Sequence, residues 1–138
     1  MNYETTGGAY VKSAGKESGP ADIRARAFAY ALRAIKLFEH LEKRGGGAGR
    51  ILGRQYLRAA TSVGANIEEA QSAESRADFI HKCGVAQKEA REALYWLRLL
   101  AESGIMPPDR LKPLIQETEE IVSIISSIII RSKRKRAA

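Results

Sequence analysis

The sequence is poor in the residues from which disulfide frameworks and metal centres are built. Its 138 residues include one cysteine and two histidines. A single cysteine excludes an intramolecular disulfide framework and every metal module with several cysteine ligands, and it suits a reducing compartment. Di-iron bundles need Glu-x-x-His on two helices, whereas this chain offers only Asp78-x-x-His81, and its other histidine, His40, directly follows a glutamate. We therefore expect neither a metal nor a cofactor.

Long apolar runs are also missing. The most apolar stretch, residues 121–130, is interrupted by three serines and is shorter than the roughly 20 residues that a membrane-spanning helix needs. Residues 1–19 are polar and rich in Gly, Ser and Thr, without the apolar core of a secretory signal. We expect a cytoplasmic protein with no membrane partner, in which residues 1–19 form a disordered leader.

Helical periodicity is the dominant pattern in the rest of the chain, and no useful length alternates with a period of two. Four segments repeat apolar residues every three or four positions, at about 21–44, 50–73, 75–102 and 109–130. We expect the glycine-rich residues 45–49 to form a flexible interhelical loop. Four helices joined by short links predict an all-α, antiparallel up-and-down four-helix bundle over residues 20–130.

The expected core consists of one apolar stripe from each segment. These stripes are Phe28, Ala31, Leu32, Ile35, Phe38 and Leu41; Leu52, Tyr56, Ala59, Val63, Ile67 and Ala70; Phe79, Cys83, Ala86, Ala90, Ala93, Leu97 and Leu100; and Leu111, Leu114, Thr118, Ile121, Ile125 and Ile128. A second stripe, Ile115, Val122 and Ile129, widens the apolar face of the last segment. Tyr95 and Trp96 lie beside the third stripe. A single bundle would leave part of this apolar surface exposed to solvent, so we expect a homo-oligomer.

The excess of basic residues is concentrated in two places. The formal net charge is +7, from 23 Lys and Arg against 16 Asp and Glu. Five of these charges fall within residues 131–136, in a C-terminal basic tail (131–138), and the stretch 22–44 is the second basic region. Such residues contact nucleic-acid phosphates, or else they solubilise a chain end and favour a helix C-terminus. The candidate phosphate contacts are Arg24, Arg26, Arg33, Lys36, Arg131, Lys133, Arg134, Lys135 and Arg136.

The second segment carries polar and small residues on its inward side. Gly64 is small enough for another helix to approach closely, and Asn66 stands between two core residues. A buried amide must be hydrogen-bonded and is able to fix helix register. We expect Arg58, Asn66 and Glu69 to form a structural polar layer. The alternative is a ligand or RNA pocket around Asn66 and Glu69.

The remaining polar motifs do not predict an enzyme. In Lys88-Glu-Ala-Arg-Glu92, Lys88 and Glu92 are spaced for an i,i+4 ion pair. We therefore expect an exposed, self-neutralised face and not a nucleic-acid patch. Cys83 lies on an apolar stripe, where cysteine acts as a small hydrophobe. No Ser-His-acid or Cys-His set is evident, and a metal-dependent nuclease using Asp78 or His81 is a third, weaker alternative.

Three motifs resemble a known family. They are Arg58-Ala-Ala-Thr-Ser-Val-Gly-Ala-Asn-Ile-Glu-Glu-Ala70, Ala77-Asp-Phe-Ile-His-Lys82 and Lys88-Glu-Ala-Arg-Glu-Ala-Leu-Tyr-Trp-Leu-Arg-Leu-Leu100. Residues 21–130 resemble the bacterial four helix bundle protein family, which includes proteins encoded within intervening sequences of 23S ribosomal RNA genes. The chain is also similar in kind to the accessory variability determinant of diversity-generating retroelements. Many relatives read Asn-Ile-Ala-Glu-Gly where this chain has residues 66–70.

The resemblance implies a left-handed antiparallel bundle that assembles into a homopentamer, often with a basic face or a central channel. It implies no catalytic residues, and for the retroelement relatives it implies binding to a reverse transcriptase and to nucleic acid. Combining both lines of reasoning, we expect a non-enzymatic, ring-forming bundle that binds RNA or DNA through basic surfaces as an accessory or scaffold protein. The alternative is an adaptor that docks a protein such as a reverse transcriptase and has no direct nucleic-acid role.

Overall fold

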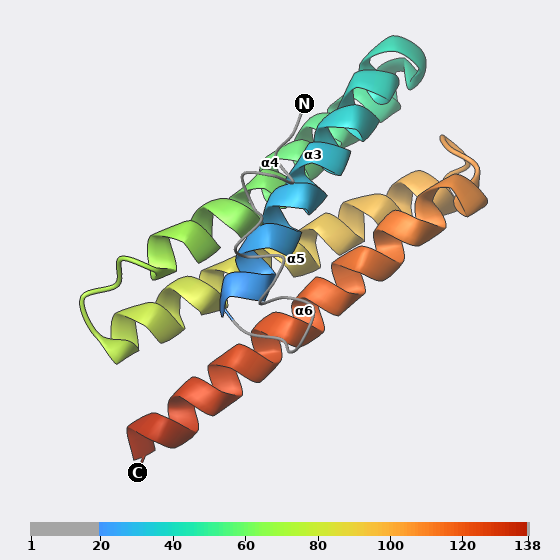
Figure 1. The fold of residues 1–138 in the computed structure, drawn as a ribbon. Helices are drawn as coiled ribbons and strands as arrows, with labels where there is room; N and C mark the ends of the chain where they lie inside the picture. Colours follow the sequence, from blue (N-terminus) through green and yellow to red (C-terminus); the bar gives the residue numbers. More distant parts are fainter. Residues whose placement is uncertain (1–19, 138) are drawn as a thin grey trace.

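The computed structural model describes residues 20–137, and these residues form four helices without a strand (Figure 1). The helices are α3 (Pro20–Arg44), α4 (Gly46–Ala70), α5 (Arg76–Glu102) and α6 (Pro108–Ala137). Each helix packs against the next in the chain, and α6 also contacts α3, although less closely. The prediction of an all-α four-helix fold is confirmed. The expected leader lies outside the described residues, and α6 continues through residues 131–137, which the sequence reading set apart as a tail.

The turn between α3 and α4 is much shorter than expected. We predicted a flexible loop over residues 45–49, but α3 ends at Arg44 and α4 begins at Gly46. Gly46 has a φ of +70°, a backbone conformation that favours glycine. A Cβ on Gly45 would lie 2.6 Å from the carbonyl oxygen of Leu41. The loop prediction is therefore wrong, because these glycines permit a turn so tight that the helix resumes at once.

The predicted core stripes of α4, α5 and α6 are largely confirmed. Nearly all of their residues are buried, while Leu52 and Phe79 are partly buried against the core. The second stripe of α6, at positions 115, 122 and 129, is also partly buried. The apolar surface that α6 leaves exposed is therefore smaller than the sequence predicted.

The predicted stripe of α3 is wrong for most of its length. The buried residues are Ile23, Ala27, Tyr30, Ala34, Leu37 and Leu41, whereas Phe28 is 53% exposed and Ile35 is 38% exposed. Two apolar stripes share this helix, and the one with smaller side chains faces the core. Its alanines allow close packing: a Cβ added to Gly64 of α4 would stand 3.6 Å from the Cβ of Ala27. The expected close approach at Gly64 is therefore observed.

A small group of polar side chains lies inside the core. The Thr118 hydroxyl of α6 donates to the carbonyl oxygen of Leu114 at 2.7 Å. The Tyr30 hydroxyl of α3 lies 2.7 Å from the same Thr118 oxygen, so Tyr30 is the donor in that contact. Tyr56 of α4 packs edge-on against Tyr30, with ring centroids 6.4 Å apart. Burial raises the pKa of both tyrosines, so their hydroxyls stay protonated.

Ion pairs between helices hold α3 against its two neighbours. Arg24 donates to both carboxylate oxygens of Glu68 on α4, at 3.1 and 3.0 Å. Arg26 donates to both oxygens of Glu117 on α6, at 3.1 and 2.6 Å, and to Glu120 at 2.8 Å. The hydrogen bond that Arg26 donates to Glu117 raises the pKa of Arg26 further above its ordinary value. These bidentate contacts fix the register of α3.

Polar contacts also join α5 to both of its neighbours. Arg58 of α4 lies 3.3 Å from Glu89 and makes a shorter contact with Glu92. On the other side, the Gln87 amide donates to the Ser126 hydroxyl of α6. Every pair of neighbouring helices is therefore joined by at least one charged or hydrogen-bonded contact as well as by apolar packing.

The first prediction concerns the buried tyrosines. Among the described side chains, the buried Tyr56 hydroxyl lacks a partner in hydrogen-bonding geometry, although it lies near the Tyr30 hydroxyl. We expect Tyr56→Phe to leave the free energy of unfolding unchanged or to raise it by up to about 1 kcal/mol, because it removes a buried unpaired group. The matched change Tyr30→Phe should lower it by about 1 kcal/mol. Urea denaturation measures both, and a Tyr56→Phe protein less stable than Tyr30→Phe would contradict this account.

The second prediction concerns pH. Hydrogen bonds from Arg58 and from the Trp96 indole lower the pKa of Glu92 from its ordinary value of 4.5. A carboxylate whose pKa is lower in the folded than in the unfolded protein stabilises the fold at pH values above its unfolded pKa. This stabilisation is lost as the pH falls through its folded pKa. Wild type should therefore melt at a higher temperature than Glu92→Gln near neutral pH, with the gap closing as the pH falls towards about 3. Thermal melts across this range measure the gap.

The control for that experiment is Glu119→Gln, since Glu119 is exposed and makes no ion pair within the described residues. Its melting temperature should track that of wild type at every pH. If the difference in melting temperature between wild type and Glu92→Gln does not change with pH, the ionised form of Glu92 does not stabilise the fold.

Candidate nucleic-acid interface

The two predicted phosphate contacts near the start of α3 are already bound by carboxylates. The side chains of Arg24 and Arg26 are 26% and 29% exposed, and each is held by glutamates of a neighbouring helix. Their positive charges are largely compensated within the bundle. The geometry therefore gives these two arginines a structural role in joining helices.

The other two predicted residues of α3 point into solvent. Arg33 is exposed, and its side chain makes no ion pair with any described residue. The Lys36 side chain is 85% exposed, and its nearest carboxylate is that of Glu39 at 4.0 Å. At such exposure an ion pair is worth little and leaves the ammonium group open to solvent and ligands.

The five predicted basic residues at the C-terminus belong to the last turns of α6. Arg131, Lys133 and Arg134 are exposed, and positions 135 and 136 continue the same helix. Because α5 and α6 are antiparallel, this segment lies at the end of the bundle where α5 begins (Figure 1). Cations at a helix C-terminus interact favourably with the helix dipole, so part of this charge has a structural explanation.

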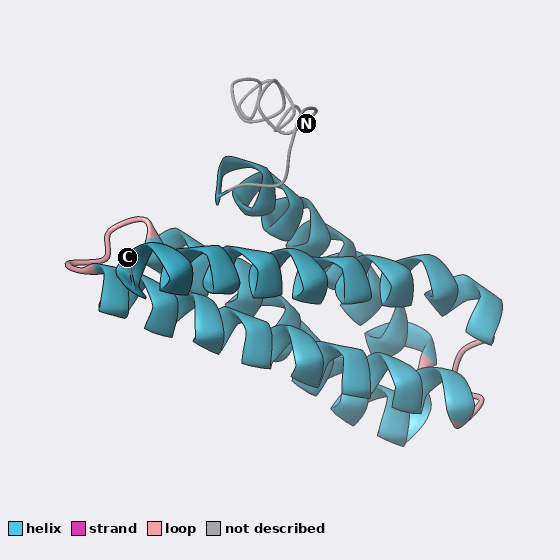
Figure 2. Ribbon diagram, turned by 90° about the horizontal axis from the view of Figure 1, so that it is seen from below, coloured by secondary structure: helices cyan, strands magenta, loops and turns pink. Residues whose placement is uncertain are grey.

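Another group of basic residues lies at the opposite end of the bundle, and of its residues the basic stretch predicted at 22–44 includes only Lys43 and Arg44. The α3–α4 and α5–α6 turns both lie there, and a Cβ on Gly49 would stand 3.2 Å from the Ile105 side chain (Figures 1 and 2). We call residues 40–54 and 98–112 the turn end. It holds seven Lys and Arg against three Asp and Glu, a formal charge of +4. Five exposed cations in it make no ion pair with a described residue: Lys43, Arg44, Arg50, Arg110 and Lys112.

The three residues of the expected polar layer make separate contacts. Arg58 binds Glu89 and Glu92, whereas the Asn66 amide donates to the Ser62 carbonyl oxygen of its own helix at 2.8 Å. Glu69 accepts from the Lys82 ammonium at 2.8 Å. Although all three residues lie on α4, the structure gives each of them a different partner, and no hydrogen bond between described residues connects them into one layer.

The predicted i,i+4 contact between Lys88 and Glu92 is not formed, although the charge of Lys88 still helps to lower the pKa of Glu92. Glu92 binds Arg58 and accepts from the Trp96 indole at 3.1 Å. No ion pair within 4 Å joins Glu92 to Lys88 among the described residues. The i,i+4 spacing was right for such a pair, but the arginine on the neighbouring helix takes the carboxylate instead.

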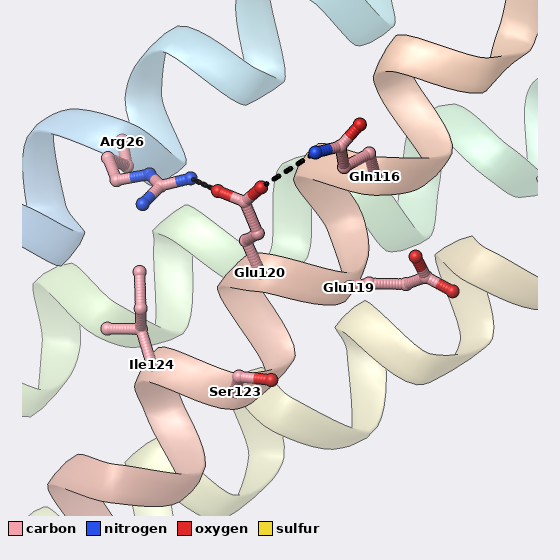
Figure 3. A pocket seen from close by; sticks show the side chains of 6 residues that line it. All are labelled: Arg26, Gln116, Glu119, Glu120, Ser123 and Ile124. Atoms are coloured by element: carbon pink, nitrogen blue, oxygen red, sulfur yellow. Dashed lines mark hydrogen bonds and ion pairs between the residues drawn. The ribbon is translucent and has the colours of Figure 1, made fainter.

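A shallow pocket of about 320 Å³ lies between α3 and α6 (Figure 3). It is lined by Arg26, Gln116, Glu119, Glu120, Ser123 and Ile124. Its single cation is bound to Glu120, and the Gln116 amide donates to that same carboxylate at 3.3 Å. With two carboxylates against one paired arginine, this pocket repels phosphate.

Two of the residues considered for catalysis, Cys83 and Asp78, make contacts typical of structural residues. Burial raises the pKa of the Cys83 thiol to about 11, which keeps it protonated at neutral pH. Asp78 accepts from the Glu74 amide, and its own amide donates to Ser75 at the start of α5, so it belongs to a helix cap. Within residues 20–137, no group of three His, Cys, Asp or Glu side chains is placed to hold a metal ion.

None of the described helices is long and apolar enough to cross a membrane. Sequence comparison finds no curated protein that matches the chain. Among the similar solved structures is a protein of unknown function from the S23 ribosomal protein family of Bacteroides thetaiotaomicron. It is 36% identical, the match covers 78% of this chain and 97% of that chain, and the TM-score is 0.74.

The family model for the 23S rRNA-intervening sequence protein matches residues 21–127, which include most of all four helices. The expected resemblance to proteins of 23S intervening sequences is therefore confirmed. This chain belongs to the 23S rRNA-intervening sequence protein family.

Proposed function

We propose that this protein is a non-enzymatic, self-associating four-helix bundle that binds nucleic acid through phosphate contacts at its two basic ends. The observation that supports it is the concentration of basic residues at the two ends of the bundle. The turn end carries a formal charge of +4 and residues 131–136 carry five basic charges, so the rest of the chain is net negative. Exposed lysines and arginines attract phosphates and release condensed counterions, which gives sequence-independent, salt-sensitive binding.

Exposed apolar residues support self-association. Ile35, Ile51 and Ile130 lie on α3, α4 and α6 and are each between 38% and 62% exposed. Single exposed apolar residues are common, but a small bundle with one on each of three helices has apolar surface on several sides. Contacts between unlike faces of identical chains close into rings when the rotation permits. We propose a ring of five chains, as the family resemblance implies, in which each basic end is repeated five times.

The third prediction tests the ring. Sedimentation equilibrium of the full chain should give a mass five times the 15.2 kDa of one chain. The substitution Ile51→Glu places a charge on exposed apolar surface and should weaken assembly without reducing helix content, since position 51 is 62% exposed. A mass of a single chain for the wild type at micromolar concentration would refute self-association.

The fourth prediction tests nucleic-acid binding. Fluorescence anisotropy with labelled RNA and DNA should show an affinity that falls linearly with the logarithm of salt concentration. Replacing Lys43, Arg44 and Arg50 with glutamine should lower the slope by about 0.7–0.9 for each phosphate contact removed. Ending the chain at Ile130 should lower it further.

The control is Arg24→Gln, because the Arg24 charge is already held by Glu68. It should change the salt slope little, with folding checked by circular dichroism. Absence of binding at low salt, or binding unaffected by salt and by both basic-end variants, would overturn the proposal. Recovery of one stoichiometric protein partner after nuclease treatment, with no nucleic-acid affinity, would instead establish the adaptor function.

A further inference from the structure

The outer face of α5 carries three cations around one exposed aromatic ring. Lys88, Arg91, Tyr95 and Arg98 are all exposed, and they follow one another at intervals of three, four and three residues. Residues at this spacing lie on one side of a helix. Ten residues of helix rise about 15 Å, so the stripe extends over nearly three turns. We call these four residues the α5 outer face.

The carboxylates that alternate with these cations in the sequence do not share the face. Glu89 and Glu92 turn toward α4, where both bind Arg58. The side chain of Glu89 is only 18% exposed as a result. Lys88 and Arg91 therefore make no ion pair with a described residue, and at the far end Arg98 has a loose, exposed pair with Glu102 at 3.6 Å. The tertiary contact with Arg58 is what leaves this face positive.

The ring of Tyr95 is exposed but has a fixed neighbour. It is 54% exposed and packs edge-on against Trp96, with ring centroids 5.2 Å apart and planes at 67°. Trp96 is held in turn by its hydrogen bond to Glu92, at 3.1 Å. The contacts from Arg58 to Glu92 and from Glu92 to Trp96 thus hold the indole against which the Tyr95 ring packs.

Cations that flank an exposed aromatic ring suit single-stranded nucleic acid. Every base has a flat face that stacks on tyrosine, while the backbone offers phosphates to neighbouring lysines and arginines. A duplex keeps its bases stacked inside and would use only the cations.

We propose that the α5 outer face binds single-stranded nucleic acid, with one base stacked on Tyr95 and adjacent phosphates bound by Lys88, Arg91 and Arg98. This inference rests on the proposed function and adds to it a second, chemically different surface. The basic ends attract any phosphate backbone, in a duplex or a single strand. The α5 outer face favours an unpaired strand because only an unpaired base is able to stack.

The fifth prediction uses Trp96, the one tryptophan of the 138-residue chain, as a reporter. Titration of the full chain with a twelve-nucleotide oligothymidine or oligouridine should quench its emission, because a base on Tyr95 would lie beside it. A twelve-base-pair duplex should bind without this quenching. Tyr95→Leu should weaken single-strand binding about 10-fold, within the range measured for base–aromatic stacking, and leave duplex binding unchanged.

Two variants separate stacking from charge. Tyr95→Phe keeps the flat ring and should retain wild-type single-strand affinity. Lys88→Gln combined with Arg91→Gln should reduce the salt slope for the single strand, while the bound strand should still quench the emission of Trp96. Both changes fall on exposed positions of α5, and circular dichroism checks that the helices are kept.

The outcomes distinguish this inference from the function on which it rests. If wild type binds duplex but no single strand, or if Tyr95→Leu binds single strands as wild type does, the α5 outer face is not the site although the basic ends still bind. If Tyr95→Leu instead loses a protein partner and keeps its single-strand affinity, the face docks protein and the inference is wrong. If wild type binds neither nucleic acid at low salt, the proposed function fails as well.

Discussion

Ion pairs between arginines and glutamates of neighbouring helices are the interaction on which the surface charge of this protein depends. Arg24, Arg26 and Arg58 each bind one or two carboxylates across a helix boundary. Individually, such partly exposed pairs add little free energy. Their larger effect is on position: each fixes the register of two helices, and each removes a carboxylate from the face where the sequence places it.

This redistribution explains why net charge was a poor guide to the proposed binding surface. The sequence indicated residues 22–44 as a basic region, yet Arg24 and Arg26 within it are compensated by α4 and α6. The turn end is positive because an antiparallel bundle brings both short turns to one end, and each turn contributes lysines and arginines. The α5 outer face is positive for a different reason, namely that Arg58 draws Glu89 and Glu92 away from it.

Packing inside the bundle shows the same dependence on neighbours. α3 has two apolar stripes of equal period, and helical spacing alone favours the one with phenylalanines. The core takes the stripe with Ala27 and Ala34 because small side chains let α3 approach α4, where Gly64 faces Ala27. The glycines after Arg44 signalled a break in the helix correctly. Their effect is a one-residue turn instead of a loop, since α4 begins at Gly46.

The sequence by itself determined the helical fold, the number of helices, the buried stripes of α4 to α6 and the family. These follow from local periodicity and from motifs within single helices, which need no knowledge of distant residues. Only the tertiary structure decided which stripe of α3 is buried, which arginines are compensated and which cations share a face with Tyr95. Those properties depend on side chains far apart in the sequence that meet across helix boundaries. A carboxylate four residues from a lysine binds an arginine 34 residues away when the fold brings that arginine closer.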